Sequence, residues 1–189
     1  MSQLEVDKII PQSGTSLTLG DSGDTFTIPS GVTLTNNGTV TGFGVNQPVW
    51  SVYNNGTQSV SHDTETTVAY NTERIDTDSA FDTSTYRFTV PSGKGGRYFI
   101  AAGIRFQDGA WGRSIKVFVN GSQSNVIGNM NYGTTSFTAD NQLSGIIDLS
   151  ASDYIEIKAK QHSGGSQNLE ALTDGWYRSY FQGFKLIEA

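Results

Sequence analysis

The alternation of apolar and polar residues changes its character near residue 45. Residues 15–44 carry apolar residues in short alternating pairs, and Gly or Asn-Gly turns separate the pairs. A period of two indicates β-strands, so we expect a run of very short strands here. Each strand offers about two inward-facing apolar residues, too few to stabilise a lone ribbon. We therefore predict a stem in which three copies wind about one axis; a disordered linker is the alternative. The pairs are Leu17 and Leu19, Phe26 and Ile28, Val32 and Leu34, and Val40 and Phe43.

From residue 46 onward the predicted strands are longer and richer in aromatic residues. Alternation is clearest in residues 86–90, 115–119 and 155–159. About ten strands and no convincing helical period predict an all-β fold, a two-sheet antiparallel sandwich. The predicted strands are 49–53, 66–70, 85–90, 97–107, 114–120, 124–130, 134–139, 142–149, 153–161 and 177–187.

These patterns divide the chain into three parts. Residues 1–14 are an N-terminal anchoring arm, 15–45 the repetitive β stem and 46–189 the head domain. The arm has neither the basic start nor the apolar core of a signal peptide, and no apolar stretch reaches the ~20 residues that span a bilayer. We expect a soluble chain that is not exported by a recognisable route and does not insert into membranes.

Composition narrows the functional classes. The net charge is −6 with no run of Lys or Arg, so the electrostatic footprint of a nucleic-acid-binding protein is missing. There is no cysteine, which excludes disulfides and thiolate metal sites and favours folding in a reducing cytoplasm. The apolar fraction of 35% and the charged fraction of 16% are low for a globular enzyme.

Several head segments follow a known order of short motifs. A strand ending in Asn is followed by Phe-Asp, then by Phe-x-x-Pro and Gly-x-Tyr-x-Phe, a later hairpin strand and a closing Phe-x-Gly-Phe. The matching segments are Tyr70-Asn71, Phe81-Asp82, 88–91 (Phe-Thr-Val-Pro), 96–100 (Gly-Arg-Tyr-Phe-Ile), 149–157 and 180–187. Over residues 66–189 the chain thus resembles the globular-head family shared by complement's first component and tumour necrosis factor.

That resemblance implies a ten-stranded antiparallel jelly roll that assembles as a tight homotrimer. The aromatic content also exceeds what one sandwich core needs, and a threefold axis would absorb the surplus. The stem is similar instead to virion structural proteins of bacteriophages, especially marine and cyanobacterial phages, which pair a short β stem with such a head. This implies a virion protein that is assembled in the host cytoplasm.

Candidate chemistry is sparse. His62 lies in Ser61-His62-Asp63, but a catalytic triad converges in space rather than in sequence, so we interpret His62 and His162 as surface-loop residues. We predict no catalytic residues and no cofactor.

One loop is rich in carboxylates, at Glu73, Asp76, Asp78 and Asp82. Carboxylates at such spacing could hold Ca²⁺, which favours several oxygen ligands. Some members of the globular-head family that the chain resembles bind Ca²⁺ near the trimer apex. A bound Ca²⁺ therefore stays open as an alternative, although the Asp-x-Asp-x-Asp-Gly loop of calcium-binding proteins is absent.

Four aromatic residues lie in or beside Gly-rich loops: Trp111, Tyr132, Trp176 and Tyr177. Aromatic side chains in loops form platforms for sugar rings and hot spots for protein partners, and they are also common within oligomer interfaces. Both interpretations stay open for these four.

Together the patterns predict a trimeric phage tail-fibre or spike protein. The arm would contact other tail or capsid proteins, and the head would bind a host-surface glycan or protein, or partner virion proteins. A purely structural connector or decoration protein and a polysaccharide depolymerase are the rivals. A cellular cytokine-like head would need a signal peptide.

Overall fold

A computed structural model describes residues 9–10, 14–38, 46–107, 112–131, 139–171 and 179–186. The chain divides into two compact units, Met1–Phe43 and Gly44–Ala189. Each unit is considered by itself below. Within the described residues no helix is long and apolar enough to cross a bilayer.

Residues 14–38 of the first unit form no strand in a single chain. The predicted stem requires three copies and stays a prediction. Local turns shape them instead: the amide of Asp24 donates to the carbonyl of Asp21, and that of Val32 to the carbonyl of Pro29. A strand needs a hydrogen-bonding neighbour, and a single copy of this segment provides none. Its apolar side chains are consequently exposed by 38–68%; they are Leu17, Leu19, Phe26, Ile28, Val32 and Leu34. Val40 and Phe43 lie outside the described residues.

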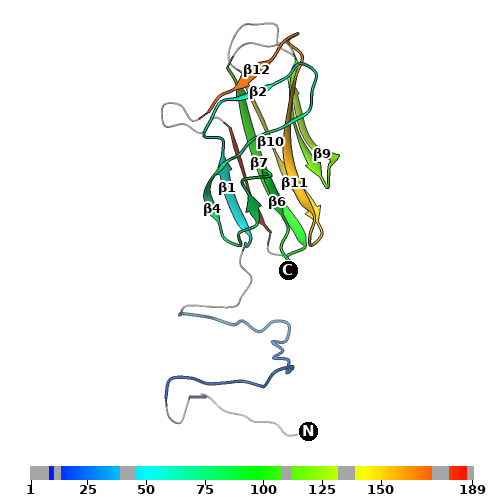
Figure 1. Cartoon of the computed structure of the whole chain (residues 1–189). Helices are drawn as coiled ribbons and strands as arrows, with labels where there is room; N and C mark the ends of the chain where they lie inside the picture. Colours follow the sequence, from blue (N-terminus) through cyan, green and yellow to red (C-terminus); the bar gives the residue numbers. More distant parts are fainter. Residues whose placement is uncertain are drawn as a thin grey trace. The chain divides into compact units, whose positions relative to one another are not determined.

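The second unit is an all-β head in which two sheets pack face to face (Figure 1). The seven-stranded sheet has the order β2-β12-β7-β13-β1-β4, with β10 also paired to β7. Its strands are β1 (Val49–Tyr53), β2 (Gln58–Val60), β4 (Thr72–Asp76), β7 (Gly96–Phe106), β10 (Ala139–Leu149), β12 (Gln167–Leu169) and β13 (Tyr180–Lys185).

The six-stranded sheet has the order β5-β6-β11-β8-β9, with β3 also paired to β11. All its strand pairs are antiparallel. Its strands are β3 (Thr66–Thr67), β5 (Phe81–Asp82), β6 (Arg87–Thr89), β8 (Arg113–Val119), β9 (Ser122–Asn131) and β11 (Tyr154–Gln161).

The predicted antiparallel sandwich is therefore confirmed, with differences in detail. The long predicted strands are present, whereas four described pieces of two to five residues, β2, β4, β5 and β12, were not expected. Polar residues dominate most of them, so their apolar alternation is too short to detect. Most of the predicted strand 134–139, and the ends of strand 177–187, lie outside the described residues.

The core lies between the sheets, where alternate residues of each strand point inward. Trp50 stacks on Phe88 from the opposite sheet with a ring-centroid distance of 3.8 Å, and Phe181 meets Trp50 edge-on at 5.4 Å. Gly183 lies beneath this cluster, and a Cβ there would overlap the Trp50 ring. This close approach explains the glycine in an otherwise aromatic strand.

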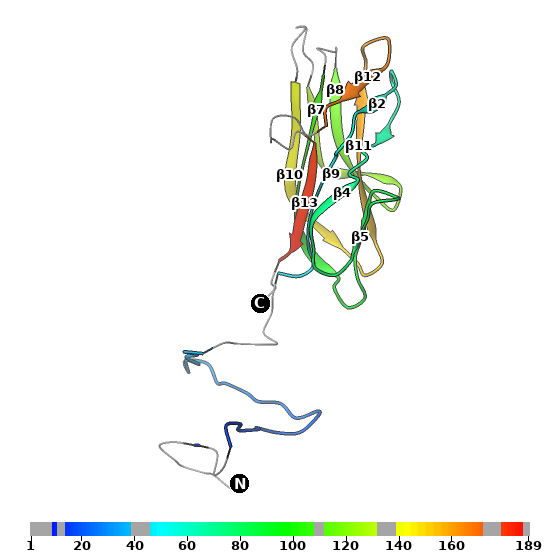
Figure 2. The same cartoon turned by 60° about the vertical axis from the view of Figure 1, so that its left-hand side comes forward.

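The strand register brings the ends of several strands together at one end of the head. Ala139 of β10 lies opposite Phe106 of β7, and Gln161 of β11 lies opposite Arg113 of β8. At this end β7, β9 and β11 finish and β8, β10 and β13 begin, and we call it the loop end. Figure 2 shows β2 and β12 there.

Candidate functional site

The outer face of the seven-stranded sheet carries an apolar row that crosses four strands. Val49 of β1 lies opposite Phe184 of β13, which lies opposite Phe99 of β7, which lies opposite Ile146 of β10. The rings of Phe99 and Phe184 are 5.5 Å apart, and Ile146 is 54% exposed. We call these four residues the apolar row. They face away from the core, because their strand neighbours point into it.

A shallow hollow of about 300 Å³ adjoins the apolar row. It extends from Phe99 and Phe184 toward Arg74 and Ile75 of the edge strand β4. Ile75 is 47% exposed and enlarges the apolar surface beyond the row. Exposed apolar patches of this kind are typical of interaction surfaces.

Toward the loop end the same face becomes polar. Tyr53 and Tyr180 lie in register, and the Tyr180 ring covers Gly103, where a Cβ would lie 2.5 Å from the ring. Burial, and to a lesser extent the charge of Asp140, raises the pKa of Tyr180. The face ends in Arg105, whose Nε lies 3.2 Å from a carboxylate oxygen of Glu170. The face thus grades from apolar through tyrosine to charged.

The outer face of the six-stranded sheet is different, because none of its described large apolar side chains is exposed. Glu156, with its side chain only 3% exposed, lies 3.1 Å from both Arg87 Nε and Lys158 Nζ. Arg87 covers the ring of Tyr154 at 4.3 Å, and Lys158 covers that of Phe118 at 4.4 Å. The aliphatic stems and aromatic rings shield the carboxylate from water. Glu156 is therefore shared between two cationic side chains and held within a single chain.

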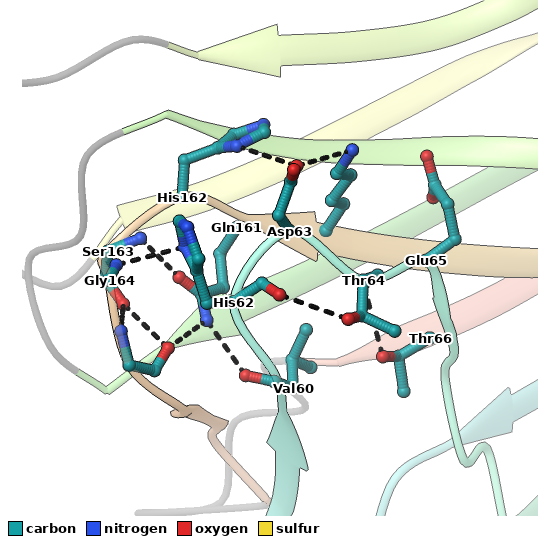
Figure 3. Close-up of polar contacts among 12 residues, drawn as sticks. Val60, His62, Asp63, Thr64, Glu65, Thr66, Gln161, His162, Ser163 and Gly164 are labelled. Atoms are coloured by element: carbon teal, nitrogen blue, oxygen red, sulfur yellow. Dashed lines mark hydrogen bonds and ion pairs between the residues drawn. The ribbon is translucent and has the colours of Figure 1, made fainter.

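A polar cluster occupies the loop end, where residues 60–66 meet residues 160–165 (Figure 3). The Asp63 carboxylate lies 2.7 Å from Lys160 Nζ and 3.1 Å from His162 Nδ1. The hydrogen bond from Lys160 is the main cause that lowers the pKa of Asp63. The imidazoles of His62 and His162 are 6.2 Å apart and nearly perpendicular, at 84°.

Gln161 holds the two segments together beneath this cluster. Its buried side-chain amide donates to the carbonyl of Val60 at 3.0 Å and to that of Gly165 at 2.6 Å. Its side-chain oxygen accepts from the amide of Ser163 at 2.6 Å (Figure 3). The backbone amide of Asp63 donates to the Gln161 carbonyl. Nothing in the sequence identified Gln161, because its role depends on partners about 100 positions away.

The cluster does not have the geometry of a hydrolytic triad. In such a triad one carboxylate orients the histidine that faces the nucleophile. Here Asp63 contacts His162, whereas His62 Nδ1 accepts a hydrogen bond from the backbone amide of Gly164. Both histidines lie in surface loops, as expected from the sequence.

The acidic loop uses its carboxylates on its own backbone. Asp76 accepts from the amides of Ala80 and Phe81, at 3.0 and 2.9 Å. Hydrogen bonds from Ser84, and then from Thr85, lower the pKa of Asp82 to about 2. In the part of the chain that the structure describes, no three metal-ligating side chains come together, and this includes Glu73 and Asp78.

Trp111, Tyr132, Trp176 and Tyr177 lie outside the described residues. The strand ends that flank their segments are described, and they converge at the loop end. Arg113 pairs with Asn131, Ala139 with Phe106, and Tyr180 with Gly103. The structure thus brings the ends of these segments to one end of the head.

Of the comparisons with known proteins, the one with solved structures identifies the fold. No protein-family model matches the chain. No curated protein matches it either. Among solved structures, the Eiger TNF of S. frugiperda has a TM-score of 0.55 and 16% identity, covering 75% of this chain and 93% of that one.

Two further structures lead to the same conclusion. Murine APRIL has a TM-score of 0.55 and 15% identity, covering 73% of this chain and 98% of its own. The globular domain of zebrafish complement 1qA protein has a TM-score of 0.50 and 16% identity, covering 76% and 100%. The head therefore has the jelly-roll fold of tumour-necrosis-factor and complement globular domains. At these identities the likeness establishes the fold alone.

Proposed function

We propose that this chain is a homotrimeric virion structural protein of a bacteriophage, of the tail-fibre or spike type. Residues 1–14 attach it to the particle, 15–45 form a spacing stem, and the head binds the host surface or partner virion proteins. The resemblance of the stem to phage virion proteins supports the virion role, and the fold of the head fits the homotrimer. It places the protein in the virion, after assembly in the host cytoplasm.

The apolar row is the observation that carries the trimer. A monomer exposes Ile146 and Ile75 and leaves Phe99 and Phe184 half-buried. Burying a fully exposed side chain of this size contributes about 1.5–3 kcal/mol, so completing the burial of a half-exposed one contributes roughly half of that. A closed threefold assembly repeats this gain in each protomer. The opposite outer face offers no comparable gain, since none of its described large apolar side chains is exposed.

The stem gives independent support from a different part of the chain. Six exposed apolar side chains alternate along residues 17–34 without a covering partner in the described residues. Three parallel copies would give each strand a hydrogen-bonding neighbour and a shared apolar axis. A trimeric stem and a trimeric head have matching symmetry.

We infer a binding role without catalysis or a cofactor. Trp111, Tyr132, Trp176 and Tyr177 are the proposed contact residues, in segments that begin and end at the loop end. Three weak sites on one rigid trimer would gain strength through avidity. The host-surface ligand would be a glycan or a protein.

Native mass spectrometry and light scattering of the full-length protein test the assembly. The expected mass is three times the 20.4 kDa of the chain, at micromolar concentration and physiological salt. A monomer at all concentrations would refute the trimeric fibre. Mass spectrometry of purified phage particles should detect the protein, and its absence there would refute the virion role.

Host binding needs its own measurement. Full-length protein should adsorb to host cells and slow phage adsorption in competition. A trimer that is present in particles but binds neither cells nor glycans would instead be a connector or decoration protein.

A further inference from the structure

One contact at the loop end depends on the protonation state of a histidine. The backbone amide of Gly164 donates a 3.0 Å hydrogen bond to His62 Nδ1, joining residues 102 positions apart (Figure 3). A backbone N–H only donates, so Nδ1 must carry a lone pair. His62 is therefore neutral in this structure, with its proton on Nε2.

His162 is arranged in the opposite way. Its Nδ1 lies 3.1 Å from a carboxylate oxygen of Asp63, which only accepts when ionised. Nδ1 of His162 therefore carries the proton and donates. Protonation of the other ring nitrogen would strengthen this contact, since the hydrogen bond would become an ion pair.

The charges around His62 are uneven. Among the described residues, His62 interacts with Asp63 and lies near His162, Asp63 also holds Lys160, and the next ion pair along the loop joins Glu65 to Lys116 at 2.6 Å. Lys160 already lies 2.7 Å from the single nearby carboxylate, Asp63. A protonated His62 would share that carboxylate with Lys160 and with the imidazole of His162.

We propose that His62 and Gly164 form an acid-sensitive latch between residues 61–65 and 162–165, released when His62 binds a proton at Nδ1. The proton comes from solvent, the imidazolium then presents N–H to the Gly164 N–H, and water hydrates both exposed donors. The latch is closed while Nδ1 of His62 is unprotonated and opens when acid protonates it. It goes beyond the proposed function and does not depend on it.

The opening is local. The bonds made by Gln161 to Val60, Gly165 and Ser163 involve no titratable group and keep the two segments attached at their base. The ion pair of Asp63 with Lys160 also persists in mild acid, because the pKa of Asp63 is lowered. Acid therefore frees Gly164 without unfolding the head.

Amide exchange by NMR on the full-length protein tests the latch. The exchange protection of Gly164, corrected for the intrinsic pH dependence of exchange, should fall by about tenfold or more between about pH 8 and 5, the range in which histidine side chains change charge. Protection of Asp63, which donates to the Gln161 carbonyl, should stay constant. If the corrected exchange protection of the Gly164 amide does not change with pH, the proposal is overturned.

Two variants separate the histidines. In His62→Asn, the side-chain oxygen takes the place of Nδ1 and still accepts from Gly164, so the pH step should vanish while protection remains. In His162→Asn, the side-chain NH₂ still donates to Asp63, so the step should persist. The opposite result would assign the step to His162.

The tautomer of His62 provides a check that needs no substitution. Nitrogen NMR of the wild-type imidazole at pH 8 should show the proton on Nε2. A proton on Nδ1 would be incompatible with the latch.

Discussion

The two outer faces of the head follow the same alternation of side chains, but they differ in how much apolar surface a single chain leaves exposed. On the six-stranded sheet, Glu156 pairs with both Arg87 and Lys158, and these two cations lie over the rings of Tyr154 and Phe118. On the seven-stranded sheet, the apolar row ends in the 54%-exposed Ile146. The content of polar residues alone therefore does not identify an interface. A row of exposed apolar side chains does, because only a second surface can bury it.

The largest expected effect is the loss of assembly when a charge enters the apolar row. Phe99→Arg should leave a folded monomer, because three desolvated guanidinium groups would meet at the interface. Native mass spectrometry measures the mass, and circular dichroism checks the β fold. Gln123→Arg, at an exposed position of the six-stranded sheet, is the matched control and should remain trimeric. A trimeric Phe99→Arg protein would remove the apolar row from the interface.

A smaller effect, on stability, should follow from breaking the ion pairs of the buried Glu156 with Arg87 and Lys158. Glu156→Ala leaves Arg87 and Lys158 without their carboxylate and should lower the free energy of unfolding by about 1–3 kcal/mol. Denaturant unfolding at one fixed protein concentration measures it, since assembly contributes to apparent stability.

The control for that substitution is an exposed ion pair. Asp148 lies 3.5 Å from Arg97, with side chains 86% and 65% exposed. Asp148→Ala should change stability by less than about 0.5 kcal/mol. Equal effects for Glu156→Ala and Asp148→Ala would mean that burial does not distinguish the two faces.

The smallest effect concerns the turn between β5 and β6 at the edge of the six-stranded sheet. The pKa of Asp82 is lowered from 3.8 to about 2, mainly by the hydrogen bonds from Ser84. The ionised carboxylate therefore stabilises the turn above pH 3.8, and this contribution is lost as the pH falls toward about 2. The Ser84 amide resonance should shift over that range. In Asp82→Asn the shift should be absent, and its persistence would assign the titration to another group.

Much of the head could be predicted from short-range patterns. Long strands such as β7 and β11 can be predicted because a strand with one buried face alternates apolar and polar side chains. The short strands could not be found, since two or three residues carry no period. Residues 14–38 carry the same alternation, but no described residue pairs with them as a strand.

The candidate sites were less accessible from the sequence. The two histidines were visible as loop residues, but their neighbours were not, because His62 bonds to Gly164 and His162 to Asp63. Trp111 and the three other loop aromatics remain predictions. The apolar row was not identified at all: its members belong to four separate strands, and each is an ordinary half-buried or exposed residue alone.

By itself, the sequence determined which side chains of each long strand point inward and hence the all-β class, because a period of two is a local property of the backbone. Only the tertiary structure decided which strands are neighbours and in what register. Pairing between distant strands depends on the packing of the whole core, where Trp50 and Phe88 from opposite sheets stack. That register aligns Val49, Phe184, Phe99 and Ile146 in one row and places His62 beside Gly164.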